Sequence, residues 1–211
     1  MSQPWRDSKP WGWLLALSGP LFPWGAAHLA LGHGWRWGWW LGPLWVFGVV
    51  PALDFAFGSD ASNPPPEFEA ELERDPWYRW CTFLYLPLQL AGLIAACALV
   101  GARPAMAWLD WLGFAGTVGA VGGIGIATAH ELGHKKPLVE RWLARLVLAQ
   151  SAYGHFFVEH NRGHHDRVAT PEDPASARLG ESFWAFWPRT VWGSACSAWQ
   201  LEARRLARHG R

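Results

Sequence analysis

Four apolar blocks constrain this chain more than any other feature. They lie at about residues 11–31, 39–57, 80–100 and 108–129. A helix of about 20 apolar residues is long enough to cross the hydrocarbon core of a bilayer, which is about 30 Å thick. The sequence therefore predicts an all-α integral membrane protein with four transmembrane helices.

Two of these blocks carry features that affect helix packing. Gly19, Pro20 and Pro23 interrupt the first block, and because proline removes a backbone hydrogen bond we expect a kinked span there. The fourth block contains the stretch GFAGTVGAVGGIG, which favours close approach of neighbouring helices. The polar, proline-rich segment between the second and third blocks is expected to lie outside the lipid.

The lysines and arginines predict the orientation of the spans. With four spans, the N-terminus, the segment between the second and third spans, and everything after the fourth span share one side of the membrane. Sixteen of the 18 basic residues are on that side, and only Arg36 and Arg103 are on the other. Because basic residues concentrate in cytoplasmic segments, we expect that side to face the cytoplasm.

Charge and cysteine content exclude two classes of function. The formal net charge is +1, and no basic stripe with interleaved aromatic residues occurs, so nucleic-acid binding is not predicted. Cys81, Cys97 and Cys196 are scattered without CxxC spacing. Neither a disulfide framework nor a thiolate metal site is therefore expected.

Residues 130–211 resemble a membrane-surface region and not a fifth span. The segments LVERWLARLVLAQSAYGHFFVEH and ESFWAFWPRTVWGSACSAW combine Trp and Arg with apolar residues at helical spacing. Such helices are typical of the membrane interface, where amphipathic side chains reach both lipid and water. We expect amphipathic, interfacial helices here, and they carry two histidine clusters.

The first cluster is HELGH, in which His130 and His134 are four residues apart. On a helix this spacing places both imidazoles on one face, with Cβ atoms about 6 Å apart, so that both reach one metal ion. The pattern also matches the H-E-x-x-H motif of zinc proteases, in which Glu131 would be the base. An intramembrane zinc protease is therefore one alternative.

The second cluster, HNRGHH, contains His160, His164 and His165. His160 and His164 repeat the four-residue spacing, and His165 is turned about 100° away on an α-helix. A zinc protease needs only one further ligand and an open position, so it leaves this cluster unexplained. Five imidazoles fit iron better, because histidine suits iron and two ions would use the surplus.

Three other titratable residues lie beside the clusters. His155 precedes His160 by about one turn, and either hydrogen-bonds a ligand or caps an interface. Glu131 and Glu159 each precede or follow a candidate ligand, and are either carboxylates that orient imidazole rings or solvated surface groups. The isolated histidines are expected to have structural roles only: His28, His33 and His209.

The motifs HELGHKK and YGHFFVEHNRGHH, together with ATPEDPASARLGESFWAFW and the loop LDFAFGSDASNPPPE, resemble those of one enzyme family. They are similar to the integral-membrane alkane 1-monooxygenases (alkane hydroxylases) of the fatty-acid-desaturase-like superfamily of histidine-box diiron enzymes. The resemblance covers nearly the whole chain. It implies that the first box supplies two iron ligands and the second box three: His130, His134, His160, His164 and His165.

The resemblance also implies an activity and partners. A complete enzyme of this family would use two iron ions and O₂ to convert the terminal methyl group of a medium-chain alkane to a primary alcohol. Its electrons would come from rubredoxin and an NADH-dependent rubredoxin reductase. It would lie in a bacterial inner membrane, with the active site on the cytoplasmic side.

Alternatives remain open. A fatty-acyl desaturase, or a hydroxylase of another apolar substrate, is the alternative within the superfamily, and a non-catalytic membrane scaffold is the alternative from another class. The family has two further histidine boxes, NYxEHYG and HxDHH, that do not occur in this chain. We therefore expect the chain to be the N-terminal part of a longer reading frame and to be inactive alone.

Four cations lie within eleven residues beside the first box: Lys135, Lys136, Arg141 and Arg145. We expect them to help dock an acidic electron donor, because complementary charge raises the rate of association. The alternative is that they only set the topology and contact lipid headgroups.

Overall fold

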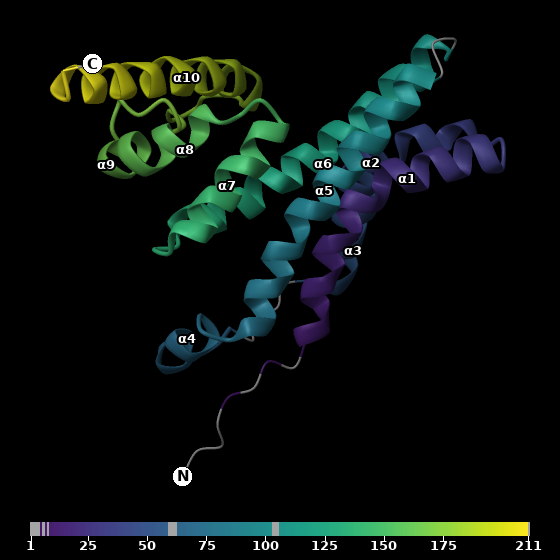
Figure 1. The fold of residues 1–211 in the computed structure, drawn as a ribbon, viewed down its shortest axis with the longest axis horizontal. Coiled ribbons are helices and arrows are strands. Elements are labelled where there is room, and N and C mark those ends of the chain that lie inside the picture. The colour runs from purple at the N-terminus through teal and green to yellow at the C-terminus, as the bar shows by residue number, and fades with distance from the viewer. Residues whose placement is uncertain (1–4, 6, 8, 59–62, 103–105, 211) are drawn as a thin grey trace. The chain divides into compact units, whose positions relative to one another are not determined.

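The secondary-structure elements in the part of the chain that the structure describes are all helices. It divides into two compact units, Met1–Thr128 and Ala129–Arg211 (Figure 1). Helices with long apolar segments and no strand among the described residues confirm the predicted all-α membrane class. The computed structural model describes these residues: 5, 7, 9–58, 63–102 and 106–210.

Among the residues that the structure describes, four helical segments are long and apolar enough to cross a membrane. They match the four predicted blocks, with ends that differ by up to five residues. The fourth extends five residues past its predicted end, so the first histidine pair belongs to the last turns of this helix. The segments are Pro10–Gly32, Arg36–Phe57, Pro76–Ala102 and Trp108–His134.

The first two spans change helix type along their length. The first begins as a 3₁₀-helix, η1 (Pro10–Leu21), with Pro20 inside it. It continues as α1 (Phe22–Ala27) and ends in a π-helical turn, η2 (His28–Gly32). The helix type is irregular where the prolines lie, because proline cannot continue a regular hydrogen-bond ladder, and the predicted kink stays a prediction.

The second span is built from four shorter pieces. A short helix, α4, lies between this span and the third, and the third and fourth spans are the long helices α5 and α6. The bounds are η3 (Arg36–Trp40), α2 (Leu41–Leu44), η4 (Trp45–Val49), α3 (Val50–Phe57), α4 (Pro66–Leu72), α5 (Pro76–Ala102) and α6 (Trp108–His134).

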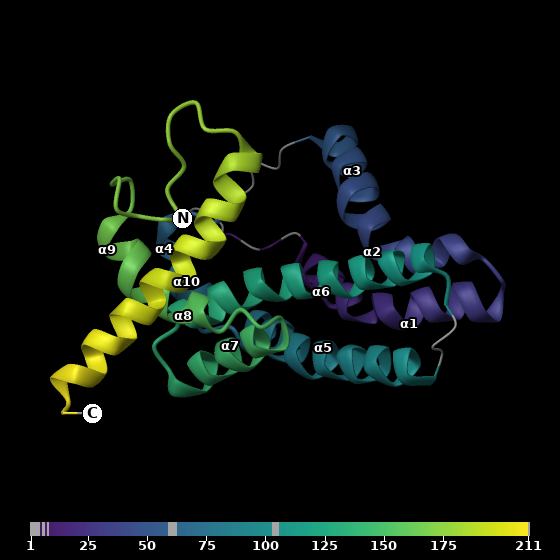
Figure 2. The same cartoon turned by 90° about the horizontal axis from the view of Figure 1, so that it is seen from above.

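Polar side chains bind backbone groups inside the first unit. The fully buried Thr117 hydroxyl donates to the carbonyl of Trp39 (2.7 Å) and accepts from the N–H of Gly42 (3.0 Å). Gly42 lies so close to Thr117 that a Cβ there would come within 2.7 Å of its Cα. The buried Tyr85 hydroxyl on α5 donates to the carbonyl of Val121 on α6 (3.0 Å), and these helices run side by side (Figure 2). Small residues thus permit the close packing that the fourth block predicts.

Many large apolar side chains of this unit point outward. Leu15, Phe47, Phe55 and Ile94 are each at least 60 % exposed. Their positions on the span helices make them the surface that would contact lipid acyl chains.

The second unit contains the helices that carry the second histidine cluster. A continuous helical run passes from α8 through the π-helical turn η5 into α9, and a loop at 168–182 leads to α10. Helix α10 packs against α8 (Figure 2). The bounds are α7 (Leu138–Gln150), α8 (His155–Glu159), η5 (His160–His164), α9 (His165–Arg167) and α10 (Phe183–Arg208).

Arg167 joins this helical run to α10. Its guanidinium donates to the buried carboxylate of Glu159 (2.8 Å), to the hydroxyl of Ser197 on α10 (2.7 Å) and to the carbonyl of Gly163 (3.2 Å). Gly163 leaves room for this pair, because a Cβ at position 163 would come within 2.5 Å of the Glu159 carboxylate, which would then have to move. Buried charge is tolerated when it is paired and hydrogen-bonded in this way.

The loop at 168–182 is fixed by Arg189 of α10. The guanidinium makes two contacts of 2.7 Å with Glu181 and also donates to the carbonyls of Pro174 (3.2 Å) and Ser176 (2.9 Å). Hydrogen bonds from Arg189 lower the pKa of Glu181 to about 2, so this pair is charged at neutral pH. The loop is therefore held in one conformation beside the histidines.

Candidate metal centre

The last turns of α6 present the first histidine pair. His130 and His134 are one helical turn apart, and their Nε2 atoms lie 3.0 Å from each other. Both side chains are partly or fully open to solvent. The four-residue spacing on a helix therefore brings the two imidazoles together as predicted.

A π-helical turn arranges the second cluster differently from the expected α-helix. The backbone N–H of His165 donates to the carbonyl of His160, five residues earlier, as in a π-helix. His165 thus lies one turn above His160, and its ring centroid is 4.7 Å away instead of being turned aside. The ring of His164 stacks on His160 at 5.3 Å. Both later histidines therefore stay beside His160.

Imidazole nitrogens of the two clusters meet at His160. Nε2 of His160 lies 3.0 Å from Nε2 of His134 and 3.2 Å from Nε2 of His165. Ligand nitrogens of His130, His134 and His160 all lie within 4.8 Å of one another. Two imidazoles bound to one ion at about 2.0–2.1 Å hold their nitrogens about 2.9–3.4 Å apart. The spacing observed here fits that arrangement.

His164 is held by a buried carboxylate. Its Nδ1 lies 2.8 Å from Oδ2 of Asp173, whose side chain is fully buried. Asp173 also accepts from the hydroxyl of Ser176 (2.6 Å) and from the N–H of Ala175 (3.0 Å). With Nδ1 donating to Asp173, Nε2 of His164 keeps its lone pair for a metal ion.

Protonation of His160 is unfavourable at neutral pH. Burial and the neighbouring imidazoles lower the pKa of His160 to about 4. Burial alone would raise the pKa of Asp173, but hydrogen bonds from Ser176, Ala175 and His164 outweigh it and lower this pKa. Neutral imidazoles beside an ionised carboxylate form the donor set that a transition metal requires.

The predicted orienting residues have three different environments. Glu131 is exposed and lies 3.2 Å from Nδ1 of His130. Glu159 is buried and contacts Arg167 instead of a histidine, and burial raises its pKa against the effect of Ser197 and Arg167. His155 packs on Tyr153, and within the part of the chain that the structure describes its buried Nε2 has no hydrogen-bond partner. Only Glu131 contacts a candidate ligand.

The cations beside the first cluster also differ. Lys135 and Lys136 are exposed between α6 and α7. Arg141 and Arg145 are half-buried on α7, and their guanidinium groups lie over the ring of Phe157, at 5.8 and 4.5 Å from its centroid. The two arginines therefore also have a packing role.

Sequence analysis missed Asp173. It lies nine residues from His164, in the loop TPEDPAS, and no helical periodicity connects the two. The sequence offers one signal, an Asp three residues before a Ser. This pattern is typical of a turn. That turn does form, since Asp173 binds Ala175 and Ser176, but it also orients a histidine.

Comparisons with known proteins agree with the motifs. The family model described as "Fatty acid desaturase" matches residues 106–211. The chain is 44 % identical to an alkane 1-monooxygenase of Ectopseudomonas oleovorans over 97 % of this chain and 51 % of that protein. It is 42 % identical to an alkane 1-monooxygenase of Pseudomonas putida over 97 % of this chain and 50 % of that protein. The chain thus spans about half the length of the curated relatives it matches, and the predicted resemblance is confirmed.

Proposed function

We propose, since the chain belongs to the fatty acid desaturase family, that it carries part of the iron site of a membrane alkane monooxygenase. The convergence of ligand nitrogens from His130, His134 and His160 carries this proposal, and Nε2 of His165 lies 3.2 Å from that of His160. The identity to alkane 1-monooxygenases supports the choice of substrate class. The active protein in this proposal includes more residues than this chain, because the relatives are about twice as long.

The donor set fits non-haem iron, and we propose two ions. Five imidazoles on adjacent helices exceed the three or four nitrogen ligands that a single zinc ion takes. His130, His134, His160 and His165 would hold iron through Nε2, and His164 would do so while Asp173 orients its ring. When bound, iron supplies the reaction with O₂ that an unactivated C–H bond requires.

The overall reaction sets what the rest of the protein must provide. A terminal methyl group, O₂, two electrons and two protons give a primary alcohol and one water. The alkane partitions into lipid, and the first histidine pair ends a helix long and apolar enough to cross the membrane. A substrate moving laterally in the bilayer therefore reaches the end of α6 without crossing water.

The decisive experiment is product analysis with the protein expressed from its complete reading frame. Membranes with iron, O₂ and an electron donor are expected to convert octane to 1-octanol, identified by gas chromatography. A terminal or internal alkene would instead support a desaturase. One equivalent of zinc together with peptidase activity would contradict the iron proposal.

The proposed site lies on the cytoplasmic side of a bacterial inner membrane, because basic residues concentrate on that side of the spans. A reporter fused between the second and third spans, after Glu73, is expected to score as cytoplasmic. A fusion in the turn between the first two spans, after Gly34, is expected to score as periplasmic. The reverse pair of results would invert the topology.

Electrons would arrive from rubredoxin, reduced through an NADH-dependent reductase, and we propose that Lys135, Lys136, Arg141 and Arg145 help dock it. Replacing Lys136 and Arg141 by Gln should raise the apparent KM for the donor by about three- to tenfold at low ionic strength. Arg208, an exposed cation at the end of α10, provides the matched control as Arg208→Gln. Donor-dependent turnover against salt measures the effect, with an unchanged KM for the alkane. If the donor kinetics are unchanged, these residues only set the membrane topology and do not bind the donor.

A further inference from the structure

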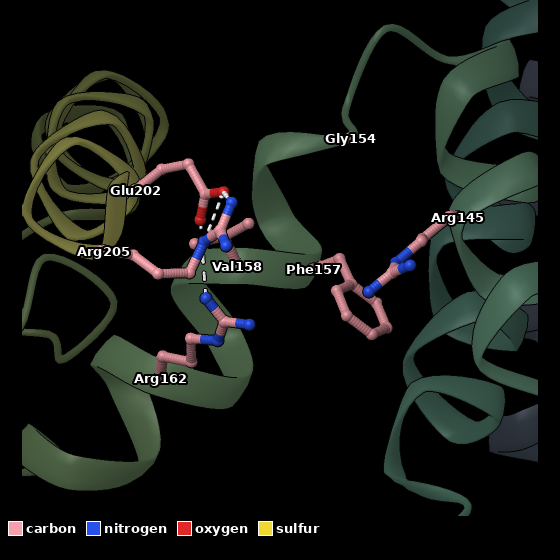
Figure 3. Close-up of a pocket in the computed structure, with 7 residues that line it drawn as sticks. All are labelled: Arg145, Gly154, Phe157, Val158, Arg162, Glu202 and Arg205. Atoms are coloured by element: carbon pink, nitrogen blue, oxygen red, sulfur yellow. Dashed lines mark hydrogen bonds and ion pairs between the residues drawn. The ribbon is translucent and has the colours of Figure 1, made fainter. Parts of the chain in front are cut away.

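Three arginines from three elements line one pocket in the second unit, and Arg145, beside Phe157, lies across from Arg162 and Arg205 (Figure 3). The volume of the pocket is about 410 Å³. Arg145 comes from α7, Arg162 from η5, and Arg205 and Glu202 from α10, while Phe157 and Val158 of α8 form an apolar surface between them. None of these side chains is among the converging histidines, so the pocket is separate from the candidate metal centre.

The pocket has more positive charge than its own carboxylate neutralises. Glu202 pairs closely with Arg205, one turn further along the same helix. Its contact with Arg162 is longer, at 3.4 Å, than the 2.7–2.9 Å that is usual for charge-assisted hydrogen bonds. The pocket is thus lined by three guanidinium groups and one carboxylate, which leaves an excess of two positive charges.

Arg145 is held in place mainly by aromatic rings, and Glu202 interacts with it only at longer range. Its guanidinium stacks over the rings of Trp142 (4.9 Å) and Phe157 (4.5 Å). Among the residues that the structure describes, no carboxylate pairs with it. Stacking fixes the plane of the guanidinium and leaves its N–H edge available, which lowers the entropy lost when an oxyanion binds.

The apolar face of α7 lies next to this pocket. Four apolar side chains on this face are more than half exposed: Leu138, Val139, Trp142 and Leu146. Leu138, Trp142 and Leu146 follow one another at intervals of four residues, so they lie on one side of the helix. Such a face suits the boundary between acyl chains and headgroups. Trp142 belongs both to this face and to the stack on Arg145, so the pocket would lie at the level of lipid phosphates.

We infer that the pocket formed by Arg145, Arg162, Arg205 and Glu202 binds a phosphate group. Guanidinium groups match phosphate oxygens in geometry, and two uncompensated charges suit a phosphate anion better than a single carboxylate does. The group is supplied either by an anionic phospholipid headgroup or by free phosphate. Glu202 competes with the anion for Arg162 and so limits the affinity.

The test measures binding by the protein expressed from its complete reading frame, and it needs no turnover. Inorganic phosphate is titrated into the detergent-solubilised protein by calorimetry. Phosphatidylglycerol retained from mixed phosphatidylglycerol–phosphatidylcholine nanodiscs is measured by native mass spectrometry. Arg162→Gln and Arg145→Gln should each lower the affinity by about tenfold, the effect of one charge-assisted contact to phosphate.

Two further variants make the test specific. Glu202→Gln should raise the affinity by about threefold or more, because it removes the competing carboxylate. A gain in affinity cannot arise from misfolding. Arg204→Gln is the matched control, since Arg204 is exposed on the same helix and does not line the pocket. It should leave the affinity unchanged.

The two probes separate the two sources of phosphate. Retained phosphatidylglycerol that is lost in Arg162→Gln assigns the site to a lipid headgroup. Phosphate binding with the same dependence on Arg162 and no retained lipid assigns it to the free anion. Equal binding of both probes by the wild type, Arg162→Gln and Arg204→Gln would overturn the inference.

Discussion

Replacing His160 with alanine should lower the iron bound to the protein to less than about a tenth of the wild-type amount. His160 is the centre of the candidate site, because its Nε2 lies 3.0 Å from that of His134 and 3.2 Å from that of His165. Changing a residue that only orients a metal ligand typically costs 10- to 100-fold in metal affinity, so loss of a ligand should cost at least as much. Iron per protein, measured by mass spectrometry after purification from membranes, checks this result.

His28 provides a matched control for the same substitution. Its Nε2 lies 3.3 Å from that of His33, so it too belongs to a pair of contacting histidines, but in the first unit. His28→Ala should keep the wild-type iron content. Wild-type iron in His160→Ala, with a normal elution profile, would remove His160 from the site.

Local rules were sufficient to predict the spans and the first histidine pair. Block length alone predicts four spans, because the thickness of the bilayer fixes the number of residues in a helix that crosses it. The contact between His130 and His134 follows from helical geometry, with Nε2 atoms 3.0 Å apart. In both cases the prediction depends only on residues within one helical turn or one span.

The remaining parts of the site depend on contacts that local rules do not contain. The π-helical turn at His160–His164 gives His165 a position that the α-helical period does not predict. Asp173 reaches His164 because Arg189 of α10 holds the loop at 168–182 through the carbonyls of Pro174 and Ser176. The sequence alone does not show that α10 and the loop at 168–182 are in contact.

Asp173→Asn should weaken iron binding by about 10- to 100-fold, although it changes neither the size nor the shape of the side chain. The carboxylate gives His164 an anionic partner 2.8 Å from Nδ1, and such a partner makes an imidazole a better metal ligand. An amide has no charge to supply. The affinity is measured by titrating ferrous iron into anaerobic apoprotein.

The substitution also leaves one donor unpaired in either orientation of the amide. Oδ1 of Asp173 accepts from the N–H of Ala175, and Oδ2 accepts from Ser176 and His164. An asparagine has only one oxygen, so its NH₂ group must face one of these donors. An unsatisfied buried donor costs about 1–3 kcal/mol, and the apoprotein should therefore also unfold at a lower temperature.

Two further variants separate the loss of charge from the loss of stability. Glu172→Gln makes the same chemical change at an exposed neighbouring position and should alter neither iron binding nor unfolding. Ser176→Ala removes a hydroxyl that binds both Asp173 and the N–H of Ala169 but keeps the carboxylate charge. It should lower the unfolding temperature while changing the iron affinity by less than about threefold, because His164 keeps its anionic partner. If Ser176→Ala weakens iron binding as much as Asp173→Asn does, then the rigidity of the loop, and not the charge on Asp173, determines how His164 holds the metal.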